Sequence, residues 1–431
     1  MTAPTPTSAG PGVPVRAPGG GRSPGDVRRT FRRRAVLALA ANGLSSLGNF
    51  LMSVVVARGE SLAGLGQFAL AFSLYVLTTG LIRATVTEAV LAEGPAPAPA
   101  AINAGVRRAC ALGAAAAGVV VAAGLAVRSP YLVILGIALC GLVVYDYLRA
   151  ISLGAGAPWA ACVQDVLWTG VTAVVAMAVL LGHLAPVLVF AGWATSGAVV
   201  GLLVAVRQGC RPLPGWGLGR AANRSTVHFG LQFLVTSGSA QLALTCLAAT
   251  AGVGVVGALG AAQTVFGPVA LLTATLSALV VPYLGHAGAT TGRARVRTAG
   301  PLVLVAVGLV APAALAVCLL PGEVGRTVLG GNWAAARPLL PLLAVEAVLV
   351  PAALVAFAGH RVHRAGKRAL LLGALLGPVR VMVVVSGGVL LGPTGAAGAL
   401  AVMAVVSASC WWLSYVSLRD EEEPWRNPVS A

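Results

Sequence analysis

The chain has 431 residues, of which 58% are hydrophobic and only 10% are charged. An average soluble domain carries about a quarter charged residues, so this composition is too apolar to cover a surface in water. The formal net charge of +17 would suggest nucleic acid as a partner in a soluble protein. The distribution of charge argues against that, because five stretches carry none: 35–57, 109–127, 166–206, 225–292 and 381–418. Each reaches or exceeds the roughly 18 to 20 apolar residues that span a bilayer, which predicts an all-α polytopic membrane protein.

The amino-terminal segment 1–34 is predicted to be a disordered basic tail. Residues 1–27 are rich in Pro, Gly, Ser and Thr and cannot bury enough apolar surface to become ordered. The basic run 28–34 then precedes a 23-residue apolar stretch, which is too long for a signal-peptide core. We therefore expect a retained first span whose amino end faces the cytoplasm.

Apolar runs separated by Gly, Pro and charged residues predict twelve spans. The first six are 35–57, 66–92, 109–127, 131–148, 159–181 and 184–206, and the second six are 227–250, 255–284, 302–320, 339–358, 369–390 and 394–418. The 68-residue stretch 225–292 would be about 100 Å long as one helix, so it must fold back. The predicted turn is 251–254, where Gly252 and Gly254 permit a tight connection.

This layout predicts two six-helix bundles, 35–206 and 227–418, joined by a cytoplasmic linker, 207–226, and followed by a cytoplasmic tail, 419–431. With a cytoplasmic start, 23 of the 29 basic residues fall on the cytoplasmic side, as the positive-inside rule requires. The net charge is then mostly a mark of topology in the cell membrane, with both termini cytoplasmic. Anionic lipid of the inner leaflet is the natural partner of the basic loops.

A weak internal repeat accompanies the two halves. A shift of 191 residues places Gly66 on Gly257, Ala71 on Ala262 and Leu81 on Leu272. Two halves entered from the same side are typical of the parallel repeats of secondary transporters, which bind substrate where the halves meet.

Charged residues deep in a span cost at least about 2.5 to 3.5 kcal/mol each, and are candidate functional residues for that reason. Arg83 and Glu88 lie five residues apart in the second span, about 140° off a common helix face, which argues against a direct local pair. Arg83 either lines a hydrated cavity that binds an anionic group or pairs with an acid on another span.

Three more deep charges lie in later spans. Arg380 follows Pro378 by two residues, and a proline there commonly kinks the helix; the arginine is a candidate for substrate contact. Glu346 is a candidate for a proton site or for a partner of an arginine. Asp165 lies near the start of the fifth span, so an interfacial role and ion coupling stay equally open.

Two polar groups favour more ordinary roles. Asp146 and Arg149, at i and i+3, predict an ion pair at the cytoplasmic end of the fourth span. The first span carries a polar stripe at helical spacing, made of Asn42, Ser45, Ser46 and Asn49, so one of its faces avoids lipid. The stripe serves either interhelical hydrogen bonding or a cavity wall, in which case Asn49 is a substrate-binding candidate.

Soluble catalytic machinery is missing from the sequence. There is no G-x-x-x-x-G-K-[ST] phosphate-binding loop, and the five histidines form no metal signature. We expect no enzyme activity, no cofactor and no metal site. The seven cysteines are scattered singly and are expected to be packing residues.

Three segments carry a resemblance to a known family. They are 47–58 with 64–72 (GLGQFALAF), 257–264 (GALGAAQT) with 266–268, and 332–338 (NWAAARP). Together they resemble the Wzx-type polysaccharide-biosynthesis flippases of the MOP exporter superfamily, which also holds the MATE drug exporters and the lipid II flippases. Twelve spans rather than fourteen argue against the lipid II branch.

The resemblance implies two six-helix bundles around a central cavity and alternating access. It implies a lipid-linked oligosaccharide as substrate, polysaccharide-biosynthesis proteins as partners, and cationic cavity residues that hold a lipid diphosphate, a role that Arg83 or Arg380 would suit. A cation-coupled multidrug exporter of the same superfamily is the second reading, and a non-transporting membrane partner protein is the third. An exporter for cations should concentrate acids in its cavity, whereas this chain mixes two deep arginines with Glu88, Asp165 and Glu346.

Overall fold

A computed structural model describes residues 24–92, 97–217, 220–287, 292–363 and 365–418. The described residues form helices and connecting turns, with no strand among them. The first half contains α1 (Pro24–Gly59), α2 (Leu62–Ile82), the π-helical turn η1 (Arg83–Thr87), α3 (Glu88–Leu91), α4 (Pro99–Ala126), α5 (Pro130–Gly154), α6 (Pro158–Gly182) and α7 (Val187–Arg207).

The second half begins with α8 (Arg220–Phe233), the π-helical turn η2 (Leu234–Gly238), α9 (Ser239–Thr250), α10 (Val253–Val265) and α11 (Gly267–Ala287). It continues with α12 (Gly292–Cys318), α13 (Gly322–Leu329), η3 (Gly330–Asn332), α14 (Trp333–Ala336), η4 (Arg337–Leu339), α15 (Leu340–Val362) and α16 (Gly366–Val416).

The described chain has ten to eleven candidate membrane spans, and twelve when α16 is divided at its kink, which agrees with the predicted number. Up to eleven helices are long and apolar enough to span, when α10 and α11, bent by 64°, count as one. The last of them, α16, has 51 residues and would be about 75 Å long if straight, far more than a bilayer needs. It is two helices joined at Gly392, whose φ of 62° is left-handed, so α16 supplies two crossings.

Local sequence explains where the helices begin and end. Pro99, Pro130 and Pro158 occupy the first turns of α4, α5 and α6, where a missing backbone N–H costs nothing. The predicted turn at 251–254 is confirmed: α9 ends at Thr250, and Gly252 has a φ of 91° that L side chains rarely adopt.

Several helices extend beyond the predicted spans, at 24, 99, 220 and 292 rather than 35, 109, 227 and 302. The added turns are rich in arginine, which ends an apolar run but not a helix, because long basic side chains can reach the headgroup region. Residues 24–34 of the predicted tail are therefore helical, and α8 starts inside the predicted linker. The remainder of that tail, 1–23, and the predicted tail 419–431 lie outside the described residues.

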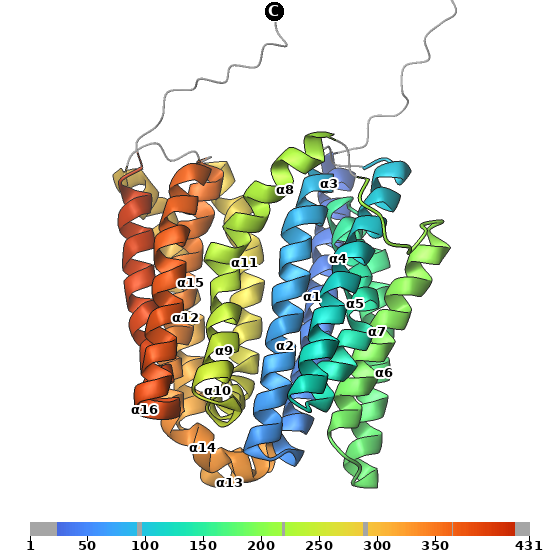
Figure 1. The fold of residues 1–431 in the computed structure, drawn as a ribbon. Coiled ribbons are helices and arrows are strands. Elements are labelled where there is room, and N and C mark those ends of the chain that lie inside the picture. Colours follow the sequence, from blue (N-terminus) through green and yellow to red (C-terminus); the bar gives the residue numbers. More distant parts are fainter. Residues whose placement is uncertain (1–23, 93–96, 218–219, 288–291, 364, 419–431) are drawn as a thin grey trace, which may run out of the picture.

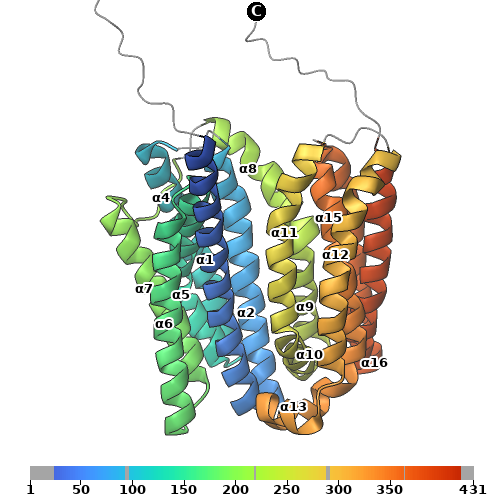
Figure 2. The same ribbon diagram turned by 180° about the vertical axis from the view of Figure 1, so that it is seen from behind.

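The helices form two lobes that lie side by side (Figures 1 and 2). The N-lobe holds α1–α7 and the C-lobe holds α9–α16, while α8 crosses from one to the other. Thr226 of α8 donates a hydrogen bond to the Thr85 carbonyl of η1 over 2.9 Å, which attaches the start of this crossing helix to the N-lobe. The start of α1 and the end of α16 lie at the same end of the bundle (Figure 2).

The lobes meet most closely at the opposite end, where α2 packs against α10. A Cβ added at Gly66 would collide with the Val253 carbonyl, and one added at Gly257 would collide with the Leu62 carbonyl. The two glycines that the internal repeat superimposes thus pack reciprocally. We call this contact of Leu62, Gly66, Val253 and Gly257 the α2–α10 seal; only glycine allows backbones to approach so closely.

A second contact strengthens the sealed end. The side-chain amide of Asn332, in η3, donates to the carbonyls of Ala57 and Glu60 over 2.8 and 2.9 Å. These carbonyls lie in the last turn of α1 and one residue beyond it, where helical hydrogen bonds run out. The segment α13–α14 lies beneath both lobes in Figure 1 and so fastens the C-lobe to α1.

Candidate functional site

A central cavity of about 480 Å³ lies between the two lobes. Such a volume falls within the range of roughly 300–1,000 Å³ typical of ligand pockets. The N-lobe side comes from α1 and α2, and the C-lobe side from α9, α10, α11 and α16. The cavity therefore lies where both halves of the chain contribute.

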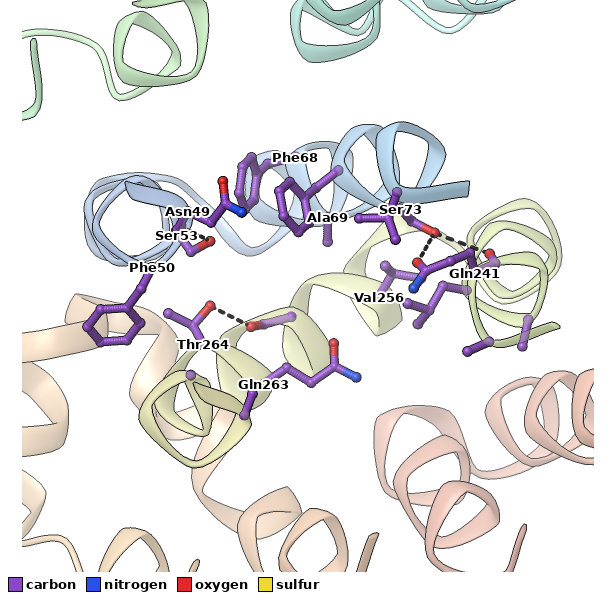
Figure 3. A pocket seen from close by; sticks show the side chains of 18 of the residues that line it. Asn49, Phe50, Ser53, Phe68, Ala69, Ser73, Gln241, Val256, Gln263 and Thr264 are labelled. Atoms are coloured by element: carbon purple, nitrogen blue, oxygen red, sulfur yellow. Dashed lines mark hydrogen bonds between the residues drawn. The ribbon is translucent and has the colours of Figure 1, made fainter. Parts of the chain in front are cut away.

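Polar side chains face each other across this cavity (Figure 3). Asn49, Ser53 and Ser73 come from the N-lobe, and Gln241 and Gln263 from the C-lobe. Apolar and aromatic lining residues separate these groups: Phe50, Phe68, Phe72, Val76, Leu244, Val256, Leu271, Val384 and Leu400. The walls combine apolar surface with a few hydrogen-bonding groups, as binding pockets generally do.

One hydrogen-bonded contact joins the lobes inside the cavity. The Ser73 hydroxyl donates to the side-chain oxygen of Gln241 over 2.9 Å and approaches its carbonyl at 3.2 Å. The contact connects α2 with α9 (Figure 3). It must break whenever the lobes separate on this side.

Asn49 combines the two roles that the first-span stripe left open, since it lines the cavity and bonds a residue of another helix. Its side-chain oxygen accepts a hydrogen bond from the indole of Trp193 over 2.9 Å, which fixes the orientation of the amide. Within the described chain no hydrogen bond uses its amide nitrogen. Asn49 can therefore donate into the cavity.

Arg380 and Glu346 form an ion pair where several cavities meet. Nη2 of Arg380, on α16, lies 2.9 Å from Oε1 of Glu346, on α15. Arg380 lines both the central cavity and a second cavity of about 210 Å³ inside the C-lobe, and Glu346 also lines this second cavity. The Nε atom of Arg380 is buried and has no hydrogen-bond partner. Nη1 makes no hydrogen bond among the described residues and the side chain is 26% exposed, so the guanidinium can bind an acceptor in the cavity.

A different arrangement surrounds Asp165 in the N-lobe. Its side chain is fully buried on α6 and receives the Nε–H of Arg149 at 2.9 Å from both oxygens. Tyr145 donates to the same carboxylate, and Arg149 also donates to Asn42 of α1 over 2.8 Å. The carboxylate is saturated by donors, and this network lines neither of the two cavities described above.

Arg83 makes a two-point contact with another span. Its Nε donates to Oδ2 of Asp146 over 3.0 Å, and its Nη2 donates to Oδ1. The pairing of Arg83 with an acid on another helix was one of its two predicted roles. The side chain stays 47% exposed, and Nη1 has no bond within the described residues.

The predicted local pair of Asp146 with Arg149 is wrong. Asp146 binds Arg83 of α2, and Arg149 binds Asp165 of α6. A pair at i and i+3 contributes only about 0.2–0.5 kcal/mol, whereas the two observed pairs join separate spans. Arg83 binds Asp146 through two nitrogens, and Arg149 shares its Nε–H between both oxygens of Asp165. Glu88 makes no direct pair with Arg83, as expected, and lies within electrostatic range of Arg361.

Sequence reasoning did not single out Gln241 and Gln263 as site residues. Both glutamines line the central cavity, and Gln263 is exposed to it (Figure 3). A glutamine inside an apolar span is itself a signal, because its amide must find partners away from lipid. That signal, applied to each span in turn, would have found both residues.

Comparison with known proteins identifies the fold. The sequence matches no protein-family model and no curated protein, but its structure is similar to solved transporters. One match is the inward-facing conformation of a multidrug resistance MATE family transporter of the MOP superfamily. The match covers 88% of this chain and 97% of that transporter, with a TM-score of 0.58 and 18% sequence identity. The outward-facing conformation of such a transporter matches with a TM-score of 0.56 and 18% identity, over 90% of this chain and 94% of the transporter. A MATE protein in complex with MaL6 matches with a TM-score of 0.57 and 18% identity, over 90% of this chain and 95% of that protein.

The chain therefore has the fold of the MATE transporters of the MOP superfamily. It is a multi-pass membrane protein with two helical lobes around a central cavity.

Proposed function

We propose that this protein moves a lipid-linked oligosaccharide or polysaccharide precursor across the cell membrane, from the inner to the outer leaflet, by alternating access. The observation that carries this proposal is Arg380, whose side chain lines the cavity between the lobes and is 26% exposed. An arginine fork suits phosphate oxygens better than any other side chain. The charged part of such a lipid is a diphosphate, and it binds here.

Alternating access is supported by how the lobes meet. The α2–α10 seal and the Asn332 contact close one end, while the polar walls of the cavity lie between the lobes. Similar transporters have been solved in inward-facing and in outward-facing conformations. The sealed end faces the outside if the arginine-rich end is cytoplasmic, so this conformation receives substrate from the inner leaflet.

Two N-lobe residues complete the proposed site. Asn49 donates its amide to a sugar or phosphate oxygen. Arg83 follows the cavity residue Val76 by seven positions, about 10 Å along the helix, and meets the headgroup on its way in. Asp146 holds its Nε and Nη2, which leaves Nη1 for the ligand.

The test is export of a lipid-linked sugar by cells or proteoliposomes that contain the full chain. Arg380→Ala should abolish export while the amount of membrane-inserted protein stays near normal, and Arg380→Lys should retain part of it because it keeps charge without the fork. Arg326→Ala, which removes an exposed arginine far from the cavity on α13, is the matched control. Export that continues in Arg380→Ala overturns the proposal.

A cation-coupled multidrug exporter is the second candidate. Glu346 lines two cavities, and Phe50, Phe68 and Phe72 line the central one, a combination that suits flat cationic compounds. Efflux of a cationic dye that is lost in Glu346→Gln and kept in Arg380→Lys would favour this candidate over the first.

A further inference from the structure

A third cavity lies beside the central one, inside the C-lobe. It has a volume of about 420 Å³ and lies between the α10–α11 bend and α15. Eight of its eleven lining residues are apolar: Phe266, Val269, Ala270, Ala274, Leu343, Ala347, Val350 and Leu354. We call it the side pocket. Its walls offer a ligand apolar surface and few hydrogen bonds.

The side pocket adjoins the central cavity. Gln263, Ala270 and Ala274 line both spaces. Glu346 lines the side pocket, and its ion-pair partner Arg380 lines the central cavity. Nη2 of Arg380 lies 2.9 Å from Oε1 of Glu346. A cationic group therefore marks the border between a partly polar space and an apolar one.

We propose that the side pocket binds the first apolar segment of an isoprenoid lipid carrier, next to its diphosphate. This inference rests on the proposed function and adds the place of the lipid tail. With the diphosphate at Arg380, a carbon chain that turns into the adjoining side pocket leaves the water of the central cavity. Burial of hydrocarbon favours the pocket, in proportion to the area removed from water.

The arrangement explains why an ion pair stands at this border. Glu346 keeps the guanidinium of Arg380 in place through Nη2, and Nη1 makes no hydrogen bond among the described residues. A free sugar diphosphate would use only the central cavity. An amphiphile uses both spaces, so the pocket selects lipid-linked over soluble substrates.

The experiment compares two probes with the full chain in lipid nanodiscs: farnesyl diphosphate and inorganic diphosphate. We expect farnesyl diphosphate to bind at least about tenfold more tightly, because its hydrocarbon is buried in the pocket. Ala347→Trp fills the pocket from α15 and should reduce that ratio to about twofold or less, with the affinity for inorganic diphosphate unchanged. Ala347→Leu should give an intermediate ratio and covers the case in which tryptophan prevents folding.

Val345→Trp is the matched control, since Val345 lies on the same helix, is 42% exposed and lines none of the three cavities. The proposal is overturned if Ala347→Trp and Ala347→Leu leave the ratio unchanged, if Val345→Trp lowers it equally, or if farnesyl diphosphate has no advantage because membrane phospholipid already fills the pocket.

Failure of the proposed function looks different. In that case neither diphosphate binds, and Arg380→Ala changes nothing. Farnesol, which lacks the anionic group, then separates the two inferences: farnesol binding that Ala347→Trp abolishes supports the pocket without the diphosphate site. Farnesol binding that is insensitive to Ala347→Trp overturns the pocket as well.

Discussion

The two lobes hold their deep charges in opposite ways. In the N-lobe, Asp165 is fully buried and accepts hydrogen bonds from Arg149 and Tyr145, away from the described cavities. In the C-lobe, Glu346 and Arg380 pair at a single contact and line cavities, and one donor of Arg380 has no partner. An arginine–carboxylate pair therefore stabilises helix packing in the N-lobe, whereas the corresponding pair in the C-lobe is available to a ligand.

Packing around the pairs agrees with this difference. The N-lobe network lies beside an aromatic cluster in which Tyr145, Trp168, Trp193 and Phe190 meet in succession, with ring centroids 4.6 to 5.5 Å apart. Aromatic pairs at such distances add stability beyond the area they bury. The network is thus enclosed in a dense core, whereas the C-lobe pair faces open space.

The largest expected effect comes from breaking the N-lobe network. Asp165→Ala leaves the Arg149 guanidinium buried without its carboxylate, which should destabilise the protein by about 3–5 kcal/mol. Thermal unfolding of the purified chain in detergent measures this. Arg149→Met combined with Asp165→Leu should recover most of the loss, because no charge is left unpaired. Normal stability with lost transport in Asp165→Ala would instead assign Asp165 to ion coupling.

The next largest effect tests whether the α2–α10 seal requires glycine at position 257. Gly257→Ala places a methyl group against the Leu62 carbonyl, and the overpacking should cost about 1–3 kcal/mol in the sealed state. Spin labels on α2 and α10 should then move apart. Gly254→Ala is the control on the same helix, since its added Cβ meets nothing within 4 Å. Equal label distances in both variants would rule out the α2–α10 seal as the determinant of closure.

A smaller effect on stability separates the two readings of Arg83. Its pair with Asp146 is half exposed, so Arg83→Ala should cost only about 1 kcal/mol or less. If Arg83 binds the substrate headgroup, export should be abolished while inserted protein stays near normal, with Arg83→Lys intermediate. Intact export in Arg83→Ala, or export lost only together with the folded protein, would leave the structural pair as its role.

The smallest effect concerns the contact across the cavity. Ser73→Ala removes the hydroxyl that donates to Gln241 and should cost about 0.5 kcal/mol, at the low end for a hydrogen bond because Gln241 is only partly buried and lines the cavity. Gln241→Leu should behave alike, and the double variant should show no additional loss. Two fully additive losses, measured by thermal unfolding, would show that the two side chains do not act together.

Much of the architecture could be predicted from the sequence because the membrane restricts the choices. Long uncharged runs must become helices, since their backbone polar groups have no other partners in lipid. The turn at Gly252 followed from length and glycine, and the deep charges at Arg83, Asp165, Glu346 and Arg380 followed from their rarity. Helix ends were harder, because hydropathy stops at arginine while helical hydrogen bonding continues through 24–34 and 292–301.

The sequence by itself determined that each deep charge needs a partner, because an ion alone in the membrane is too costly. Only the tertiary structure decided which partner each one has. Asp146 lies three residues from Arg149, yet it binds Arg83, and Arg149 binds Asp165, because helix packing brings these side chains together from separate spans. The sequence showed Gly66 and Gly257 only as equivalent positions of an internal repeat. The structure shows that α2 and α10 pack against each other at these two glycines. Spacing along one helix controls local neighbours, and contacts between helices depend on how whole faces pack.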